Sequence, residues 1–361
     1  MTYLDRARAA LDAIRAQDRF REVPAEEPAY AADFSSNDYL GLARDSRMVE
    51  AMRHVKAVGS GGARLLGGRH REHTLLEQDL ARWLGRERAL LFSSGYLAAL
   101  GAISVLAPLV DGIYSDELNH ASLIDGMRAA KTARHVFAHG ALPARGTRGG
   151  SALIVSESLF GMDGDVVDAA RLVDALGDDD VLLLDEAHAI GVLGDRGAGT
   201  AGGIEDDRVV VLGTLGKALG AAGGFIAGPS ATIDLLVNAA RTFIFDTALP
   251  PAIAFAARVG VMLAKSADDR RDRLRANVER LHRGLQAIGF PVPARAVPIV
   301  PVIAGSERDA LELMRRCSRR GVYAPAVRPP TVPAGSSRLR VSVRADHTAE
   351  QIDLLLEALA G

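Results

Sequence analysis

The sequence predicts an α/β protein with a mainly parallel central sheet covered by helices, followed by a small C-terminal α+β domain. Short apolar runs rich in Val, Ile and Leu alternate with helix-like segments from about residue 45 to residue 250. This alternation is typical of a parallel sheet with both faces buried. After residue 250 a long charged helix leads into a shorter mixture of strands and helices. The 361 residues are enough for one large and one smaller domain.

The individual elements follow from the spacing of the apolar residues. In the large domain we expect strands at 88–94, 112–117, 152–158, 181–187, 208–214 and 223–228. In the small domain we expect strands at 299–305 and 338–343, and helices at 267–289, 307–320 and 348–360. Residues 3–17 carry Leu4, Ala7, Leu11 and Ile14 at helical spacing, which predicts an amphipathic helix. The predicted division is an N-terminal helix and arm at 1–44, a large domain at 45–250 and a small domain at 251–361.

Composition excludes several classes of protein. The chain is 48% hydrophobic and 24% charged, with a net charge of −2. It therefore lacks the clustered basic surplus of a nucleic-acid binder. Cys317 is the single cysteine, so an internal disulfide framework is excluded and a structural thiol is expected. The first residues lack the apolar core of a signal peptide, and no run of about 18 apolar residues appears. We expect a cytoplasmic protein.

The segment "LLLDEAHAIG" at 182–191 contains the four letters of the DEAH box of ATP-driven helicases. Such a motor also needs a phosphate loop, G-x-x-x-x-G-K-[ST], upstream of the box. The Gly216-Lys217 pair lies downstream instead, Val211 replaces the first glycine, and Ala218 stands where a hydroxyl residue is required. Order, spacing and residue type therefore exclude the helicase.

Asp185, His188 and Lys217 suggest a different chemistry. Asp185 ends one predicted strand, His188 follows three residues later, and Lys217 follows the next strand in "TLGKALG". A desolvated lysine amine can form a Schiff base, and pyridoxal phosphate needs such a lysine together with an acid paired to its pyridine nitrogen. The alternative is a solvated lysine in a glycine-rich loop and an acid that caps a helix. These residues alone leave both interpretations open.

Other segments bear on this choice. In "FSSGYLAAL", the backbone N–H groups of Gly95 and Tyr96 could hold a phosphate at a helix N-terminus, or the segment is a plain strand-to-helix turn. His120 in "LNHAS" could lie on a ring face or simply begin a helix. His70 and His73 in "HREH" lack a third metal ligand, so we expect surface polarity there and no metal site.

Taken in order, the motifs identify a family. The chain resembles the α-oxoamine synthases of the fold-type I pyridoxal-phosphate enzymes. The resemblance covers nearly the whole chain and rests on "FSSNDYLGLA", "GSGGARLLGG", "LFSSGYLA", "DELNHASLIDG", "ESLFGMDGD", "LLLDEAHAIGVLGDRGAG", "TLGKALG", "ALPP" and "RPPTVPAGSSRLRVSV". It implies a fold-type I transferase, pyridoxal 5'-phosphate as cofactor and a homodimer.

The resemblance also implies a role for each matching residue. Lys217 would carry the cofactor as a Schiff base and act as acid and base at the substrate Cα. Asp185 would pair with the pyridine nitrogen, His188 with the ring's 3'-oxygen, and His120 would stack on the ring. The phosphate would be bound by Gly95, Tyr96 and Thr214, with Thr247 reaching in from a second subunit. The amino-acid carboxylate would be held by Asn37 and Arg328, and further substrate contacts would come from Arg21, His120 and Thr331.

Two positions depart from the family pattern. The family usually has serine where this chain has Gly161 in "FGMDGD", and that serine hydrogen-bonds the ring's 3'-oxygen. Here the contact is lost or replaced by water, and His188 would carry the task alone. Asp246 stands beside Thr247 where a small hydroxyl residue is common.

Within the family, the C-terminal motif and the short N-terminal helix followed by Arg21 are most similar to one branch. Its members condense L-alanine with a pimeloyl thioester, carried by coenzyme A or a carrier protein, in biotin synthesis. The resemblance implies these substrates, with decarboxylation, for this chain. Another α-oxoamine synthase, such as a glycine acetyltransferase, is the alternative. A catalytically silent relative that binds cofactor is a more remote one, favoured by Gly161 alone.

Overall fold

The computed structural model describes residues 1–23, 29–142 and 144–361. The described residues form two compact units, each assembled from separate stretches of the chain. The larger unit comprises Asp38–Gly161 and Asp165–Arg271, and the smaller comprises Met1–Asn37, Met162–Gly164 and Asp272–Gly361. Residues 24–28 of the predicted N-terminal arm lie outside the described residues.

These units differ from the predicted domains at both boundaries. Helix α9 (Pro251–Lys265) packs against α2 (Ser46–Arg53) and α3 (Arg71–Leu84), so it belongs to the larger unit. At the other boundary, β1 (Ala32–Asp33) pairs in parallel with β10 (Val322–Tyr323). This pairing joins the N-terminal segment to the C-terminal residues across a sequence separation that local patterns do not reveal.

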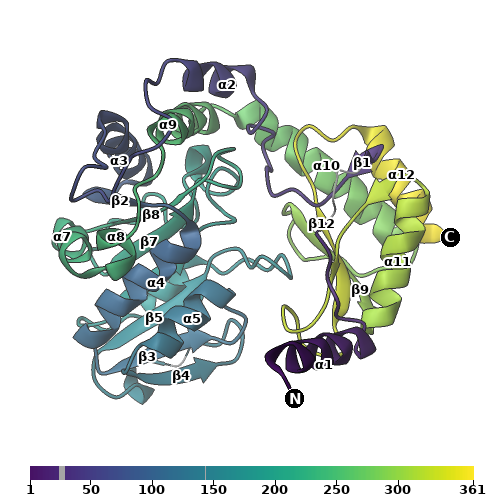
Figure 1. The fold of residues 1–361 in the computed structure, drawn as a ribbon, viewed down its shortest axis with the longest axis horizontal. Coiled ribbons are helices and arrows are strands. Elements are labelled where there is room, and N and C mark those ends of the chain that lie inside the picture. Colours follow the sequence, from purple (N-terminus) through teal and green to yellow (C-terminus); the bar gives the residue numbers. More distant parts are fainter. Residues whose placement is uncertain (24–28, 143) are drawn as a thin grey trace. The chain divides into compact units, whose positions relative to one another are not determined.

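The larger unit is built around a mainly parallel sheet in the strand order β2-β8-β7-β6-β5-β3-β4 (Figure 1). The strands are β2 (Arg88–Phe92), β3 (Gly112–Asp116), β4 (Ala133–Phe137), β5 (Ala152–Glu157), β6 (Val181–Asp185), β7 (Val209–Thr214) and β8 (Gly224–Gly228). Strand β8 runs antiparallel to β2 and β7, and the neighbouring pairs from β7 to β4 are parallel. The predicted α/β class, the mainly parallel sheet and every strand predicted for this region are confirmed.

Strand β4 was not predicted. It lies at the edge of the sheet, and its residues before Phe137 are exposed. An exposed edge strand can carry polar residues, so the sequence "ARHVF" lacks the apolar run that marks the inner strands.

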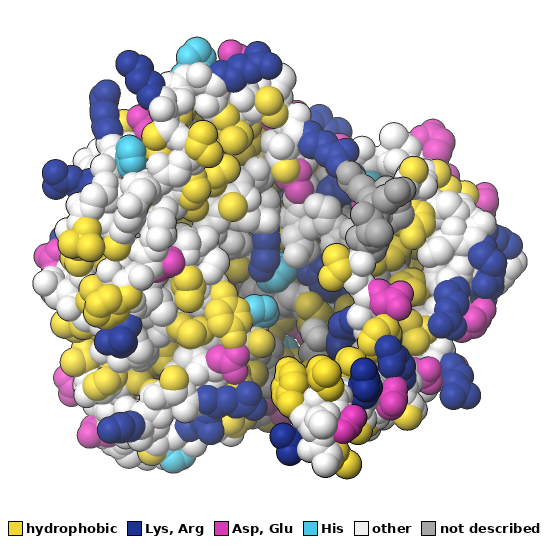
Figure 2. Space-filling view, viewed as in Figure 1, with side chains coloured by type: hydrophobic (Ala, Val, Ile, Leu, Met, Phe, Trp, Pro, Cys, Tyr) yellow, Lys and Arg dark blue, Asp and Glu magenta, His cyan; other side chains and the backbone are white. Residues whose placement is uncertain are grey.

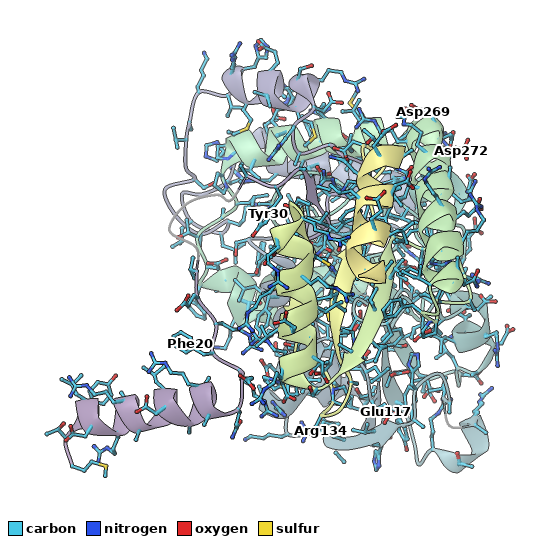
Figure 3. The ribbon with its side chains drawn as sticks, turned by 90° about the vertical axis from the view of Figure 1, so that its right-hand side faces the viewer. Phe20, Tyr30, Glu117, Arg134, Asp269 and Asp272 are labelled. Carbon is cyan, nitrogen blue, oxygen red and sulfur yellow. The ribbon has the colours of Figure 1, made fainter. Side chains whose placement is uncertain are left out.

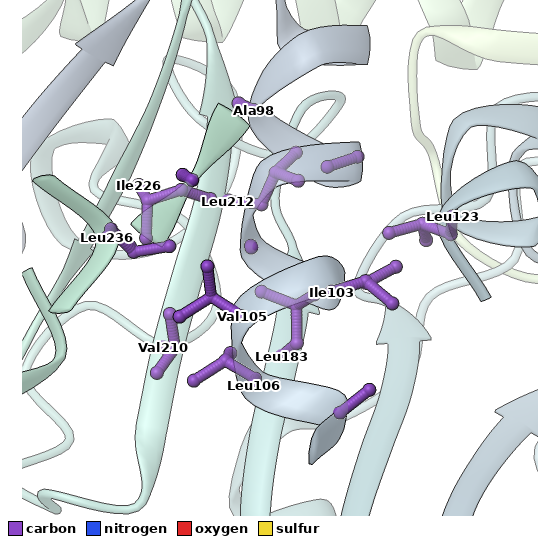
Figure 4. Close-up of a cluster of buried hydrophobic side chains, with 14 of the residues drawn as sticks. Ala98, Ile103, Val105, Leu106, Leu123, Leu183, Val210, Leu212, Ile226 and Leu236 are labelled. Atoms are coloured by element: carbon purple, nitrogen blue, oxygen red, sulfur yellow. The ribbon is translucent and has the colours of Figure 1, made fainter. Parts of the chain in front are cut away.

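Both faces of the sheet are buried. Leu183 belongs to a hydrophobic cluster with Ile103 and Leu106 of α4 (Gly95–Leu106), and Figure 4 shows these side chains between the helix and the strands. Leu182 and Leu184 alternate to the opposite face and are also fully buried. Each such leucine contributes about 1.5–3 kcal/mol to folding. Burial on both faces explains why β6 reads as a continuous apolar run.

The remaining helices of the larger unit are α5 (Ala121–Ala129), α6 (Ala169–Asp174), α7 (Ser230–Ala239) and α8 (Arg241–Ile244). Helix α4 packs against α5, α7 and α8, and α6 packs against β6. Because β3, β5, β6 and β7 are parallel, their carboxyl ends meet at one edge of the sheet. The loops that leave this edge carry His120, Gly161, His188 and Lys217, so the topology gathers the predicted site residues there.

The smaller unit contains an antiparallel sheet in the order β11-β12-β9. Its elements are β9 (Ile299–Gly305), β11 (Ala326–Val327) and β12 (Ser337–Ser342), with α10 (Asp268–Ala287), α11 (Glu307–Arg319) and α12 (Ala349–Ala360). Helix α10 begins at the end of the larger unit. The predicted elements of this region are present with ends that agree closely.

Helix α1 (Tyr3–Ala16) is amphipathic but buries none of its residues, all of which are described. Thr2 and Asp5 form a capping box at its start. Tyr3, Leu4 and Leu11 are exposed, and Figure 2 shows hydrophobic side chains over this helix. Figure 3 shows its side chains projecting on all sides, with Phe20 beyond its end. Among the described helices, none has the length and apolar character needed to cross a membrane.

Candidate active site

Lys217 and His188 lie in hydrogen-bonding contact at the carboxyl edge of the sheet. Lys217 Nζ is 2.7 Å from His188 Nε2, and the other ring nitrogen, Nδ1, is 2.7 Å from Tyr39 Oη. His188 and Tyr39 are buried, whereas Lys217 keeps partial exposure. The structure therefore brings together two predicted residues, and adds Tyr39, which lies in the quoted "SSNDYLG" motif but was not predicted to belong to the site.

Asp185 is the last residue of β6 and its side chain is buried. Its Oδ1 accepts a hydrogen bond of 2.9 Å from the backbone N–H of Ala187. Burial raises the pKa of Asp185, while the charge of Lys217 acts in the opposite direction. A buried carboxylate of this kind is stabilised by a cationic partner, and a protonated pyridine nitrogen has that character.

Glu157 is a second buried carboxyl group in this region, and the sequence did not indicate it. It is the register partner of Asp185 on the neighbouring strand. Burial, and then the negative charge of Asp185, raise the pKa of Glu157 to about 8. Its carboxyl group accepts backbone hydrogen bonds from His120 and Gly161, so it ties together the loops that follow β3 and β5.

Glu186, the second letter of the DEAH sequence, has a structural role. It is fully buried, and its carboxylate accepts hydrogen bonds from Ser158 Oγ at 2.7 Å, Thr200 Oγ1 at 2.8 Å and the backbone N–H of Ala201 at 2.7 Å. The two adjacent acidic residues at the end of β6 therefore differ in their interactions. Glu186 anchors the loop around Thr200, whereas Asp185 interacts electrostatically with Lys217.

The N-terminus of α4 forms a cradle of small residues. Ser94 caps the helix by accepting the backbone N–H of Leu97 at 3.1 Å. A Cβ placed on Gly95 would lie 3.5 Å from Thr214 Cβ, and a Cβ on Gly224 would collide with the Gly95 backbone. Thr214 Oγ1 also accepts the backbone N–H of Gly216 at 3.2 Å. Backbone N–H groups beside a hydroxyl at a helix N-terminus suit a phosphate group.

The side chain of Tyr96 turns away from a role in this cradle. It is 42% exposed, and its phenol donates a hydrogen bond to the carboxylate of Asp125. The structure thus leaves the backbone N–H of Tyr96, rather than its ring, as the group that could meet a phosphate.

Asp246 and Thr247 lie in the loop that follows α8. Ser93 Oγ donates a hydrogen bond to Asp246, which accounts for the acid at a position where the family commonly has a small hydroxyl residue. Thr247 is exposed. Its predicted contact with the phosphate of a second subunit stays a prediction.

His120 is the N-cap residue of α5. Its Nδ1 lies 2.8 Å from Ser122 Oγ and accepts the backbone N–H of Ser122 at 3.2 Å. His120 is exposed at the surface of the chain, yet desolvation of its ring by neighbouring atoms, followed by the charge of Lys217, lowers its pKa. A lowered pKa favours the neutral imidazole, and a neutral ring suits stacking on an aromatic ring. Its two possible roles, helix start and ring contact, are compatible.

Gly161 lies against the ring of His188. A Cβ at this position would be 2.5 Å from His188 Nε2 and 3.1 Å from Cδ2. A serine therefore could not enter here unless the imidazole moved. The glycine that departs from the family pattern thus leaves room for the imidazole of His188 in its observed position.

The smaller unit carries the predicted substrate-binding residues. Arg328 is buried and donates a 2.6 Å hydrogen bond from Nη1 to the backbone oxygen of Asp18, while Arg21 donates to the backbone oxygen of Pro329 at 3.3 Å. Burial, followed by the charge of Arg21, lowers the pKa of Arg328. Two neighbouring guanidinium groups favour an anionic ligand. Thr331 is exposed and its N–H donates to Arg328 O at 3.1 Å.

Asn37 is also in the smaller unit. Its Oδ1 accepts a 2.8 Å hydrogen bond from the buried Arg340, which also donates to Ser342 Oγ at 2.6 Å. The amide of Asn37 is therefore oriented by a fixed guanidinium. Arg340 lies in the quoted motif "RLRVSV" and was not predicted to support the site.

His73 of the histidine pair at 70 and 73 is not at the surface, contrary to expectation, whereas His70 is partly exposed. His73 is fully buried, its Nδ1 accepts the backbone N–H of His70 at 3.3 Å, and its Nε2 lies 2.6 Å from Leu249 O. It links α3 to the loop before α9. Among the described residues, no group of three or more His, Cys, Asp or Glu side chains is arranged to hold a metal ion.

Comparisons with known proteins show the family of the chain. A model of the family aminotransferase class I and II matches residues 31–359. The 8-amino-7-oxononanoate synthase of Methylococcus capsulatus is 44% identical, over 98% of this chain and 97% of that protein. The enzyme of the same name from Acidithiobacillus ferrooxidans is 43% identical, with the same coverage of 98% and 97%.

Solved structures give the same result. A serine palmitoyltransferase from S. paucimobilis with a bound PLP–myriocin aldimine superposes with a TM-score of 0.89 at 27% identity, over 100% of this chain and 98% of that one. The 8-amino-7-oxononanoate synthase of Francisella tularensis superposes with a TM-score of 0.80 at 27% identity, over 91% and 96%. The likeness in sequence and fold extends over nearly the full length of the chain.

Proposed function

Because the chain belongs to the 8-amino-7-oxononanoate synthases of the aminotransferase class I and II family, we propose that it condenses L-alanine with a pimeloyl thioester, using pyridoxal 5'-phosphate. The reaction joins the alanine Cα to the acyl carbon and releases the thiol and carbon dioxide, as a step of biotin synthesis. The observation that carries the proposal is the contact of 2.7 Å between Lys217 Nζ and His188 Nε2, beside the buried Asp185.

The residues present fit the cofactor. Bound pyridoxal phosphate supplies an electron-withdrawing ring that stabilises negative charge at the substrate Cα. Lys217 would hold the cofactor covalently, Asp185 would keep the pyridine nitrogen protonated, and His188 would hydrogen-bond the 3'-oxygen. His120 would cover the ring. The cradle formed by Gly95, the Tyr96 backbone and Thr214 would bind the phosphate, joined by Thr247 from a second subunit.

The substrate groups are assigned to the smaller unit. Arg328 and Asn37 would hold the carboxylate of alanine, and Arg21 and Thr331 would contact the substrates further from the reacting carbon. Lys217 would remove the Cα proton of alanine and later return one to the product. Both proton transfers need a positioned amine that can take up and return a proton, and Lys217 Nζ, in contact with His188 Nε2, would serve as that amine.

Several finer points belong to the same proposal. The thioester carrier is either coenzyme A or a carrier protein. The sequence does not distinguish the two, because no motif identifies the surface on which the carrier docks. The homodimer and the cytoplasmic location stay predictions.

The test is the visible absorption of the purified protein with pyridoxal phosphate, followed through addition of L-alanine and then of a pimeloyl thioester. We expect a cofactor band that changes with alanine, and release of equal amounts of carbon dioxide and thiol after the second addition. A response to glycine with an acetyl donor instead would assign the chain to the glycine acetyltransferases. A band without turnover on any of these substrates would indicate a silent relative.

A further inference from the structure

The imidazole of His188 is held at both of its ring nitrogens. Nε2 faces Lys217 Nζ and Nδ1 faces Tyr39 Oη, each at 2.7 Å. Tyr39 is fully buried, and its ring centroid lies 6.1 Å from that of His188. Tyr39 is the second residue of the larger unit, which begins at Asp38, whereas His188 follows β6. The contact therefore joins segments far apart in sequence.

The direction of the Tyr39 hydrogen bond decides what His188 can do. A neutral imidazole carries one N–H and one bare nitrogen, and a partner at one nitrogen fixes the tautomer. If Tyr39 donates its O–H to Nδ1, the ring proton lies on Nε2. An Nε2–H can donate to the 3'-oxygen of the cofactor, whereas a bare Nε2 would face that oxygen lone pair to lone pair.

We propose that Tyr39 is a positioning residue, whose hydroxyl donates to Nδ1 of His188 and so keeps the proton on Nε2, aimed at the cofactor's 3'-oxygen. This inference rests on the role assigned to His188 in the proposed function. Phenol is suited to the task because it brings no charge: a carboxylate at Nδ1 would favour the doubly protonated, cationic ring.

The glycine at residue 161 makes the orientation of His188 more important. A serine hydroxyl at residue 161 would be a second donor to the 3'-oxygen, but a Cβ there would lie 2.5 Å from His188 Nε2. Of these two positions, His188 alone therefore supplies a side-chain donor. Residue 161 supplies no second side-chain donor to the 3'-oxygen, so the residue that orients His188, Tyr39, becomes more important.

The experiment compares the wild-type holoenzyme with Tyr39→Phe, which removes the hydroxyl and keeps the buried ring. The readout is the pH titration of the cofactor's visible absorption. A donor to the 3'-oxygen stabilises its negative charge and weakens its hold on the proton shared with the lysine nitrogen. Loss of the donor should therefore raise the titration midpoint, by about one pH unit for a tenfold change in proton affinity.

Tyr114→Phe is the matched control. Tyr114 is a buried tyrosine of β3 in the same unit, where it stacks on His135 with a centroid distance of 4.8 Å. Its midpoint should equal that of the wild type. An unchanged midpoint in Tyr39→Phe, or an equal shift in Tyr114→Phe, overturns the inference. Asp185, Glu157, His120 and Lys217, the other titratable groups of the region, are unaltered in both variants.

A second measurement covers the case in which Tyr39→Phe does not fold. Histidine labelled with ¹⁵N in the wild-type holoenzyme reports the tautomer directly, and His188→Gln identifies the resonance. A proton on Nε2 with bare Nδ1 supports the inference, and the opposite tautomer overturns it. Failure of the proposed function looks different, since the wild-type protein would then show no cofactor band to titrate.

Discussion

At the scale of single residues, Lys217 is the position on which the proposed chemistry depends. Lys217→Ala should abolish turnover. Of the side chains of Lys217 and Tyr39, which both contact His188, only the lysine has an amine that can hold the cofactor covalently and also move the Cα proton. We expect a loss of at least about 10³-fold in kcat, given that the substitution removes both functions. The measurement is release of thiol and carbon dioxide from alanine and the pimeloyl donor.

Lys131→Ala is the control for this substitution, because Lys131 is exposed and its removal should leave the rate unchanged. A Lys217→Ala protein that still turns over would refute the assignment of the lysine.

Asp185 offers a test of electrostatics rather than of covalent chemistry. Asp185→Asn keeps the shape of the side chain and removes its charge, so the pyridine nitrogen would no longer be held protonated. We expect kcat to fall by about 10²-fold or more, as when a preorganised charge interaction is lost. The fold should survive, since burial raises the pKa of this carboxyl and its charge costs stability. Thermal unfolding and turnover are measured together, and near-normal turnover contradicts the role.

The sequence indicates the residues to which we assign the chemistry more readily than the buried residues that contact them. Lys217, Asp185 and His188 lie in short motifs at strand ends, and the parallel topology brings those ends to one edge. Glu157 and Tyr39 were missed because their importance depends on partners in other segments: the register of β5 with β6, and the contact of Tyr39 with His188. No local pattern reports such partners.

At the scale of secondary-structure elements, the buried strands of the larger unit's sheet were predictable and its exposed edge strand was not. The apolar runs of β5, β6 and β7 follow from burial on both faces, whereas the exposed edge strand β4 has no such run. Helix α1 shows that apolar periodicity can predict a helix without predicting that its apolar face is buried. Its apolar spacing predicts the helix correctly, yet none of its residues is buried in the chain.

The link between α3 and the loop before α9 yields a prediction of pH dependence. Burial lowers the pKa of His73 to about 4 from an ordinary 6.5, while the Leu249 carbonyl acts in the opposite direction. Between these values the unfolded chain binds more protons than the native state. The stability from neutral His73 is therefore fully present above pH 6.5 and is lost as the pH falls through 4.

From this group alone, the free energy of unfolding should be about 2 kcal/mol lower at pH 5 than at pH 7. His73→Gln cannot be protonated, so its stability should fall less over this range. The measurement is urea unfolding at both pH values, with His54→Gln as the control because His54 is exposed on the C-terminal side of α2. Equal pH dependence in wild type and His73→Gln would show that His73 does not titrate on unfolding.

At the scale of the whole molecule, the two compact units divide the proposed work. The residues assigned to the cofactor lie in the larger unit. Of those assigned to the substrates, Arg21, Asn37, Arg328 and Thr331 lie in the smaller unit, and His120, which is also assigned to the ring, lies in the larger. The sequence predicted a large and a small domain but placed their boundaries differently. The pairing of β1 with β10 and the packing of α9 are long-range contacts, which local spacing cannot encode.

This division predicts that cofactor and substrate stabilise different parts of the chain. Pyridoxal phosphate at about 100 times its Kd should add about 2.7 kcal/mol to the free energy of unfolding, since it binds the native state. Hydrogen exchange should slow at the cradle after β2 and in the loops of His188 and Lys217. Added L-alanine should then slow exchange in the segments of Asn37 and Arg328. Helix α11 is the internal reference, because none of its residues is assigned to either ligand. For amides that exchange through local opening, cofactor protection as large in α11 as near Lys217, or none near Lys217, would contradict the division of roles between the units.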